Sequence, residues 1–115
     1  KLPLVNENTK MKDVILEMTK KSFGLVGVLN KNKKIVGVIT DGDLRRGLNA
    51  KFLDKLAKDI MTKKPKIIPD NLLLLDALSI MNKNKITCLF ISKNKSTIKP
   101  VGIVHIHDCL RLIQN

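Results

Sequence analysis

Residues 34–46 read KIVGVITDGDLRR, and residues 99–111 read KPVGIVHIHDCLR. The two stretches align at an offset of 65 residues, and each joins an apolar strand pattern to a charged segment that is typical of a short helix. The pairs of identical residues in this alignment include Gly37 with Gly102, Asp43 with Asp108, and Arg46 with Arg111. The chain is therefore a tandem repeat, and the repeat decides the fold class.

An apolar helix face repeats upstream, at an offset of 63 residues. Its four members follow the i, i+3, i+4, i+7 spacing of a buried helix face. They are Met11, Val14, Ile15 and Met18 in the first copy, and Leu74, Ala77, Leu78 and Met81 in the second. The two-residue difference falls in a hairpin between strands. The sequence thus predicts an α/β (α+β) fold with two pseudo-symmetric β-α-β-β-α halves.

The repeat also predicts the organisation of the chain. We expect a first repeat over residues 1–50, a connector with some helix over 51–58, and a second repeat over 59–115. Asn8 or Thr9, and Asp70, can cap the long helix that follows them, because short polar side chains accept hydrogen bonds from first-turn amides. Leu72 to Leu75 are four consecutive leucines, so at least one must point away from its own half. Burial inside the domain and packing against another chain are both open.

Composition narrows the class of partner. The 115 residues carry a net charge of +12, but the lysines alternate with asparagines in predicted turns, and Trp and Tyr are absent. That arrangement lacks the aromatic platform of a nucleic-acid binder and argues against one. No apolar run reaches the roughly 20 residues of a membrane span, so we expect no membrane contact and a cytoplasmic location. Cys88 and Cys109 lie in apolar stretches and are expected to be reduced core residues.

Thr40 and Asp43 stand three residues apart where a predicted strand meets a predicted helix. This spacing suits a nucleotide, because free amides and a hydroxyl can donate to a phosphate while a carboxylate accepts from two ribose hydroxyls. It also suits an ordinary capping box with Thr40 as N-cap. The second copy keeps the carboxylate as Asp108 but has His105 in place of Thr40, which predicts a degraded cap there.

Other polar residues near the two turns allow further interpretations. His105 and His107 are only two residues apart, and no third basic ligand is nearby, which argues against a metal site. Arg45, Arg46 and Arg111 lie late in the short helices. They suit either the negative end of a helix dipole or a contact with a phosphate or another subunit. No nucleophile with a matching base is present, so we assign no catalytic residue and expect a binding module.

The repeat order, the junction DIMTKKP at residues 59–65 and the Thr-x-x-Asp motif resemble a tandem pair of cystathionine-beta-synthase (CBS) domains, a Bateman module. More narrowly, GVITDGDLRR together with VGIVHIHDCLR resembles the CBS pair that ends bacterial D-arabinose-5-phosphate isomerases. That enzyme family interconverts ribulose 5-phosphate and arabinose 5-phosphate with an N-terminal sugar isomerase (SIS) domain, for the Kdo branch of lipopolysaccharide synthesis. The resemblance implies that this chain is a fragment of such an isomerase.

The resemblance further implies a regulatory module that binds a nucleotide between its halves and forms a homodimer through its helices. The implied ligand is an adenosine nucleotide or a cytidine sugar nucleotide, and no cofactor is required. The implied ligand residues are Thr40, Asp43, Leu4 and Val5 in one half and His105, Asp108, Ile67 and Ile68 in the other. A ligand-free assembly module, and a regulatory pair of another enzyme or transporter, remain the alternatives.

Overall fold

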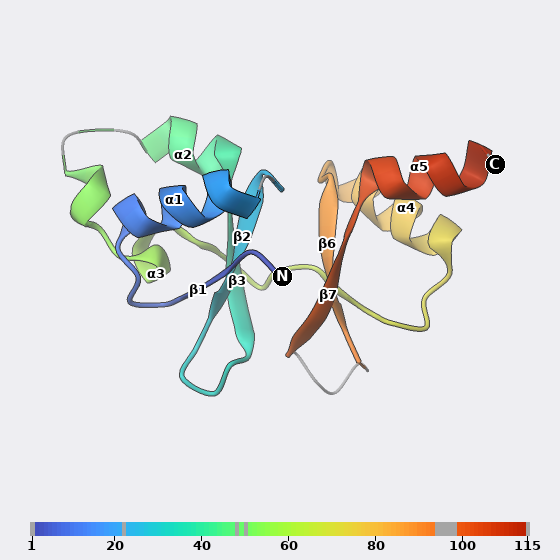
Figure 1. The fold of residues 1–115 in the computed structure, drawn as a ribbon, viewed down its shortest axis with the longest axis horizontal. Coiled ribbons are helices and arrows are strands. Elements are labelled where there is room, and N and C mark those ends of the chain that lie inside the picture. Colours follow the sequence, from blue (N-terminus) through green and yellow to red (C-terminus); the bar gives the residue numbers. More distant parts are fainter. Residues whose placement is uncertain (1, 22, 48, 50, 94–98, 115) are drawn as a thin grey trace. The chain divides into compact units, whose positions relative to one another are not determined.

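The computed structural model describes residues 2–21, 23–47, 49, 51–93 and 99–114. By its internal contacts the chain divides into two compact units, Lys1–Pro65 and Lys66–Asn115, which are described in turn (Figure 1). Much of the predicted hairpin KNKSTIK lies outside the described residues.

The first unit is built on a four-stranded sheet in the order β1-β2-β3-β4. Strand β1 pairs parallel to β2, and β3 pairs antiparallel to both β2 and β4. Its elements, in chain order, are β1 (Leu4–Asn6), α1 (Met11–Lys21), β2 (Leu25–Leu29), β3 (Ile35–Thr40), α2 (Asp41–Gly47), the 3-10 helix η1 (Phe52–Asp54), α3 (Ala57–Ile60) and β4 (Thr62–Lys63).

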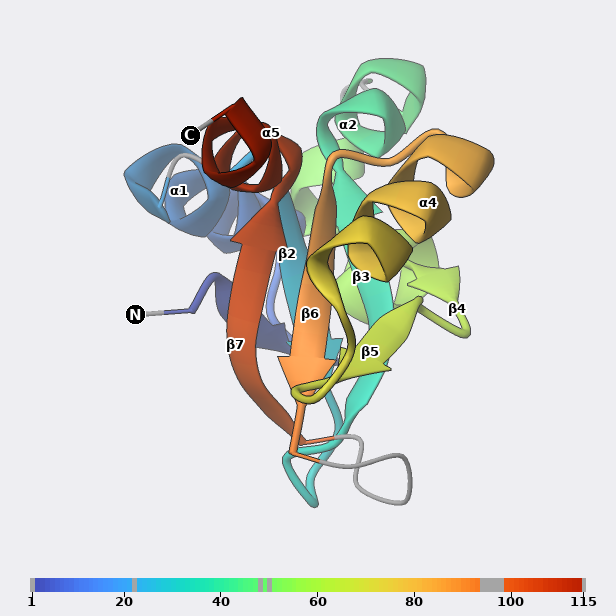
Figure 2. The same ribbon diagram turned by 90° about the vertical axis from the view of Figure 1, so that its right-hand side faces the viewer.

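The second unit repeats this plan with a three-stranded sheet in the order β5-β6-β7 (Figure 2). Strand β5 pairs parallel to β6, and β6 pairs antiparallel to β7. Its elements are β5 (Ile67–Pro69), α4 (Leu74–Asn84), β6 (Cys88–Ser92), β7 (Pro100–His105) and α5 (Ile106–Gln114).

The strand registers confirm the duplication residue by residue. Leu4 pairs with Gly27 in the first sheet, and Ile67 pairs with Phe90 in the second, each shifted by 63 residues. In the second pairing of each sheet, Leu25 lies opposite Thr40, while Cys88 lies opposite His105. Both pairings shift register after equivalent residues. The predicted α/β fold with two pseudo-symmetric halves is therefore confirmed.

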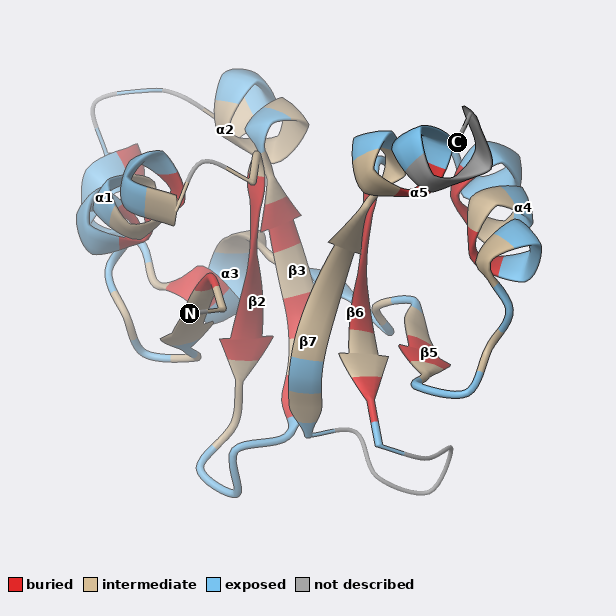
Figure 3. Ribbon diagram, turned by 45° about the vertical axis from the view of Figure 1, so that its right-hand side comes forward, coloured by how far each residue is buried: buried red, intermediate tan, exposed pale blue. Residues whose placement is uncertain are grey.

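Each unit has an aliphatic core between its sheet and its helices, and the central strands carry the most buried residues (Figure 3). The first core consists of Met11, Val14, Met18, Val26, Val28, Ile39, Phe52 and Ala57. The second consists of Ile68, Ala77, Met81, Leu89 and Cys109. The thiols of Cys88 and Cys109 are buried as expected, and burial raises the pKa of each.

Two predicted helix caps are wrong. The hydroxyl of Thr9 accepts a hydrogen bond from the amide of Asn6 at 3.1 Å, and the amide of Met11 donates to the carbonyl of Lys55 at 2.8 Å. Helix α4 begins at Leu74, with Leu73 as its N-cap and no side-chain cap bond, so Asp70 lies too early to cap it. A turn of the preceding loop, or a distant carbonyl, satisfies the groups that a side chain was expected to satisfy.

The segment after α2 is attached to the first unit. The amide of Ala57 donates to the carbonyl of Thr9 at 2.8 Å, the amide of Lys58 donates to Glu7 at 3.0 Å, and β4 adds a short edge to β3. Residues up to Pro65 thus belong to the first compact unit, although the repeat alignment starts its second copy at residue 59. The division into residues 1–50, 51–58 and 59–115 stays a prediction about the repeated sequence.

The four consecutive leucines divide between the core and the surface. Leu72 and Leu74 pack against the second core, whereas Leu73 and Leu75 are 72% and 68% exposed. On the first unit, Leu16 of α1 is also largely exposed. Among the residues that the structure describes, no helix is long and apolar enough to cross a membrane.

Candidate functional site

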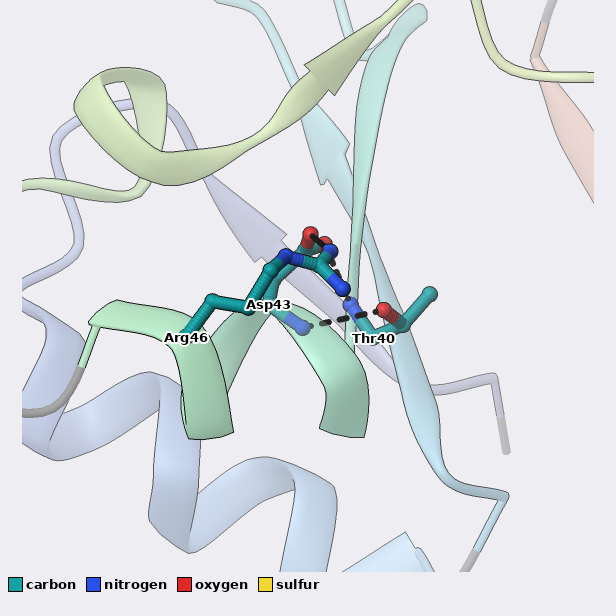
Figure 4. Close-up of polar contacts among 3 residues, drawn as sticks. All are labelled: Thr40, Asp43 and Arg46. Carbon is teal, nitrogen blue, oxygen red and sulfur yellow. Dashed lines mark hydrogen bonds and ion pairs between the residues drawn. The ribbon is translucent and has the colours of Figure 1, made fainter.

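Thr40 and Asp43 form a reciprocal capping box where β3 ends and α2 begins (Figure 4). The amide of Asp43 donates to the Thr40 hydroxyl at 3.3 Å, and the amide of Thr40 donates to Asp43 Oδ2 at 2.9 Å. Each side chain satisfies an amide that the first turn of a helix leaves free. The pairing holds the carboxylate at a fixed place above the end of the strand.

Arg46 closes over the same carboxylate from the last turn of α2. Its Nη2 lies 2.5 Å from Asp43 Oδ1, so both carboxylate oxygens have a partner within the helix. The side chain of Asp43 is only 11% exposed, while that of Arg46 is 74% exposed. Gly42 makes room for the guanidinium, because a Cβ at that position would lie 3.2 Å from Arg46 Nη1.

The equivalent turn of the second unit uses a different cap. His105 Nδ1 accepts a hydrogen bond from the amide of His107 at 3.1 Å, and the two imidazole rings stack with centroids 4.8 Å apart. The prediction of a degraded cap is therefore wrong, because an imidazole nitrogen replaces the threonine hydroxyl. Asp108 forms an ion pair with Arg111 and is 50% exposed.

A backbone hydrogen bond fixes each of the two turns to the preceding strand. The amide of Asp41 donates to the carbonyl of Gly24 at 3.1 Å, and the amide of Ile106 donates to the carbonyl of Thr87 at 2.7 Å. Gly24 has a φ of 77°, a conformation that glycine adopts at little cost. The two units therefore position their polar turns by the same main-chain contact.

The entry strands contribute one residue each to the face that carries the polar turn. Residues directly across a sheet share a face, and the registers place Leu4 on the face of Thr40, and Ile67 on the face of His105. Val5 and Ile68 lie on the opposite faces and pack in the cores. Leu4 and Ile67 are thus the members of the predicted pairs that lie beside the polar side chains.

The remaining candidates are placed as follows. Arg46 and Arg111 pair with the carboxylates three residues before them, and Arg45 is exposed. In the described part of the chain, no group of three or more His, Cys, Asp and Glu side chains could hold a metal ion. The sequence reasoning missed Gly42, whose lack of a side chain admits Arg46, although the change from Gly42 to His107 between the copies was visible.

Two hollows lie on the first unit. One, of about 330 Å³, includes Gly24, Asp41 and Leu44 in its lining and adjoins the start of α2. The other, of about 1180 Å³, is lined by Leu4, Val5 and the β2–β3 hairpin, but by neither Thr40 nor Asp43. Volume therefore does not identify the site, and the arrangement of polar groups carries the argument.

The comparison with protein families agrees with the geometry. A family model described as the CBS domain matches residues 1–50 and again residues 57–115. This chain belongs to the CBS domain family. Its two β-α-β-β-α halves are the two CBS repeats, and the two polar turns occupy equivalent places in them.

Relatives of this CBS pair include a named enzyme. The chain is 37% identical over 112 residues to the arabinose 5-phosphate isomerase KdsD of Yersinia pestis, covering 96% of this chain and 33% of the enzyme. It is 39% identical over 111 residues to an uncharacterised protein of Rickettsia prowazekii, covering 96% of this chain and 34% of that protein. The CBS pair thus spans about a third of the length of these relatives.

A solved structure with the same fold is that of CBSX2 in complex with AMP. It superposes with a TM-score of 0.82 at 25% identity, covering 98% of this chain and 87% of that chain. The fold of a tandem CBS pair is therefore shared with a protein that binds a nucleotide.

Proposed function

We propose that this CBS pair is the regulatory, nucleotide-sensing part of an arabinose-5-phosphate isomerase. The single observation that carries the proposal is the capping box of Thr40 and Asp43, which presents an anchored carboxylate at the end of β3. The AMP complex of CBSX2 and the named isomerase of Yersinia pestis support the ligand class and the parent protein, respectively.

The carboxylate of Asp43 keeps capacity for a ligand despite its two partners. An ionised carboxylate offers about four acceptor positions, and Thr40 and Arg46 each use one. The remaining positions can accept from the two hydroxyls of a ribose. Leu4, on the same face of the sheet, supplies an apolar surface for a base.

The second repeat offers a weaker version of this arrangement. Asp108 and Ile67 correspond to Asp43 and Leu4, but the imidazole of His105 stands in place of the threonine hydroxyl. Asp108 is also more exposed than Asp43, so water competes more strongly for it. The first repeat is therefore the stronger nucleotide site.

In the parent protein, the CBS pair would follow an N-terminal SIS domain that converts ribulose 5-phosphate to arabinose 5-phosphate in the cytoplasm. Ligand binding would then regulate that isomerase, with an adenosine nucleotide or a cytidine sugar nucleotide of the Kdo pathway as the effector. The leucine side chains exposed on the helices, Leu16, Leu73 and Leu75, would form the contacts of a homodimer.

The decisive test replaces Asp43 while keeping its role in the cap. In Asp43→Asn the amide oxygen still accepts from Thr40, but the charge that strengthens bonds to ribose hydroxyls is gone. We expect a loss of about 10- to 100-fold in affinity for AMP or cytidine monophosphate by calorimetric titration, because hydrogen bonds to a charged group contribute about 1.5–3 kcal/mol. Asp108→Asn should have a smaller effect.

Asp59 provides a matched control in the same unit. Its Oδ2 accepts from the amide of Leu56 at 3.1 Å, which is the same N3-to-N-cap contact at the start of α3. Asp59→Asn should leave nucleotide affinity unchanged. Equal affinity of the wild type and Asp43→Asn would refute the role of Asp43.

A ligand-free assembly module is the second candidate function. It is favoured by the engagement of both Asp43 oxygens within α2 and by the exposed leucines. Absence of binding by the wild type, for adenosine and cytidine nucleotides alike, would select this function.

A further inference from the structure

The two CBS repeats cap their polar turns with groups that respond differently to acid. In the first repeat, the acceptor is the hydroxyl of Thr40, which does not change its charge in water. In the second repeat, the acceptor is the Nδ1 atom of His105. Imidazole is the side chain that changes its charge between about pH 5 and pH 8.

The hydrogen bond from the His107 amide fixes the protonation of His105. A ring nitrogen that accepts a hydrogen bond carries no proton, so the neutral ring has its proton on Nε2. Adding the second proton at Nδ1 turns the acceptor into a donor. The amide of His107, at 3.1 Å, would then face another N–H group and lose its partner.

Protonation would also place a positive charge where the fold disfavours one. His105 precedes the first residue of α5, whose nine residues direct the positive end of their dipole toward it. The ring of His107 stacks on His105 at 4.8 Å, so protonation of both rings would bring two like charges together. Each effect opposes the closed cap in acid.

The surrounding groups do not supply a dedicated counter-charge. Within α5, the carboxylate of Asp108 is paired with Arg111. On β6, the residue opposite His105 is the buried thiol of Cys88, and burial raises its pKa, so it stays neutral in this range. On α4, which packs against α5, the charged residues are Asp76 in the first turn, Lys83 in the last turn, and Lys85 at the C-cap.

We propose that His105 is an acid-sensitive cap, which releases the first turn of α5 as the pH falls from about 8 to 5 while the first turn of α2 stays closed. The release frees the amide of His107 and loosens the turn that holds Asp108. If the proposed function is correct, acid would therefore weaken the second candidate ligand site and leave the first one intact. The cap itself does not depend on that function.

Nitrogen-15 NMR of the whole chain tests the proposal directly. At pH 8 we expect the shifts of His105 to report the tautomer with its proton on Nε2. Between pH 8 and pH 5, hydrogen exchange of the His107 amide should accelerate by about 5- to 30-fold relative to the Asp43 amide, which serves as an internal reference for the intrinsic effect of pH. A proton on Nδ1 at pH 8, or a constant exchange ratio, would overturn the proposal.

Two variants separate the cap from its stacked neighbour. His105→Thr installs the acceptor of the first repeat and should abolish the change in the exchange ratio. His107→Gln removes the stacked ring but keeps the amide and His105, so the change should persist. A change that survives in His105→Thr, or one that vanishes in His107→Gln alone, would contradict the assignment. The tautomer measurement on the wild type decides the matter even where a variant does not fold.

Discussion

The glycines at the centres of β3 and β7 occupy equivalent places in the two repeats but have different neighbours. A Cβ added to Gly37 would lie 2.5 Å from Met61 Sδ, 2.8 Å from its Cγ and 3.0 Å from its Cβ. A Cβ added to Gly102 would meet Ile91 at 3.7 Å, an ordinary contact. Gly37→Ala and Gly102→Ala therefore form a matched pair that measures the packing of Met61 across β3.

The expected magnitudes follow from these distances. Favourable contacts lie at about 3.5–4.0 Å, so the sulfur of Met61 would have to retreat by about 1 Å, and its Cβ, close to the backbone, cannot rotate away. Overpacking of this kind costs about 1–3 kcal/mol. Replacing a glycine that has no need of positive φ restricts the unfolded chain and returns about 0.4–1 kcal/mol. Gly37→Ala should thus lose about 1–2 kcal/mol, and Gly102→Ala should gain about 0.4–1 kcal/mol.

Urea denaturation followed by circular dichroism measures both changes as shifts of the midpoint. With a slope of about 1–3 kcal/mol per molar urea, Gly37→Ala should lower the midpoint by about 0.5–1 M. Met61→Ala in the Gly37→Ala background should remove most of the cost, which gives a coupling energy above about 0.5 kcal/mol in a double-mutant cycle. A Gly37→Ala chain as stable as the wild type, or a cost that persists without the Met61 side chain, would refute the packing argument.

Two further predictions concern the second unit. Burial raises the pKa of the thiols of Cys88 and Cys109, so above their ordinary value of about 8.5 the unfolded chain loses these protons first, and the free energy of unfolding should fall as the pH rises from about 8.5 to 10. Denaturant titrations at several pH values should show this slope, and Cys109→Ala should reduce it; an unchanged slope would contradict the prediction. Leu73→Lys with Leu75→Lys should convert a homodimer to a monomer by sedimentation without loss of helix, because both side chains are exposed. Unchanged sedimentation of the variant would exclude these leucines from the interface.

The strands and the long helices could be predicted because their signals are local and occur twice. The face of Met11, Val14 and Met18 repeats in Ala77 and Met81, and all five residues are buried in the structure. The different offsets before and after the hairpin reappear in the strand registers. A pattern that recurs in two copies of one chain constrains both copies, which a single amphipathic segment cannot do.

The attachment of residues 55–65 to the first unit could not be predicted in this way. Strand β4 has only two residues, too few to show an alternation of apolar and polar side chains. The contacts of Lys55 with Met11 and of Ala57 with Thr9 are main-chain hydrogen bonds, which leave no trace in the choice of side chain. The failed cap at Thr9 has the same origin, since a carbonyl far along the chain takes the amide of Met11.

The polar turns were predicted as places, but only in part as contacts. The capping box of Thr40 and Asp43 was one of two interpretations of their spacing, and the structure realises it. The acceptor role of His105 was missed, because it depends on which ring nitrogen points at the amide of His107. A residue type shows that a group is polar, whereas its rotamer decides whether that group donates or accepts.

The differences between the two turns give the duplicated halves different electrostatics. Asp43 is enclosed at 11% exposure, with Arg46 folded over Gly42, whereas Asp108 is 50% exposed beside Arg111. An ion pair in a less hydrated place is screened less by water and salt, so raising the ionic strength should loosen the pair of the second repeat before that of the first. Because His105 adds a group that titrates and Thr40 does not, acid and salt both act first on the second repeat. The duplication therefore supplies two turns of one shape, of which the first is built for constancy and the second for response.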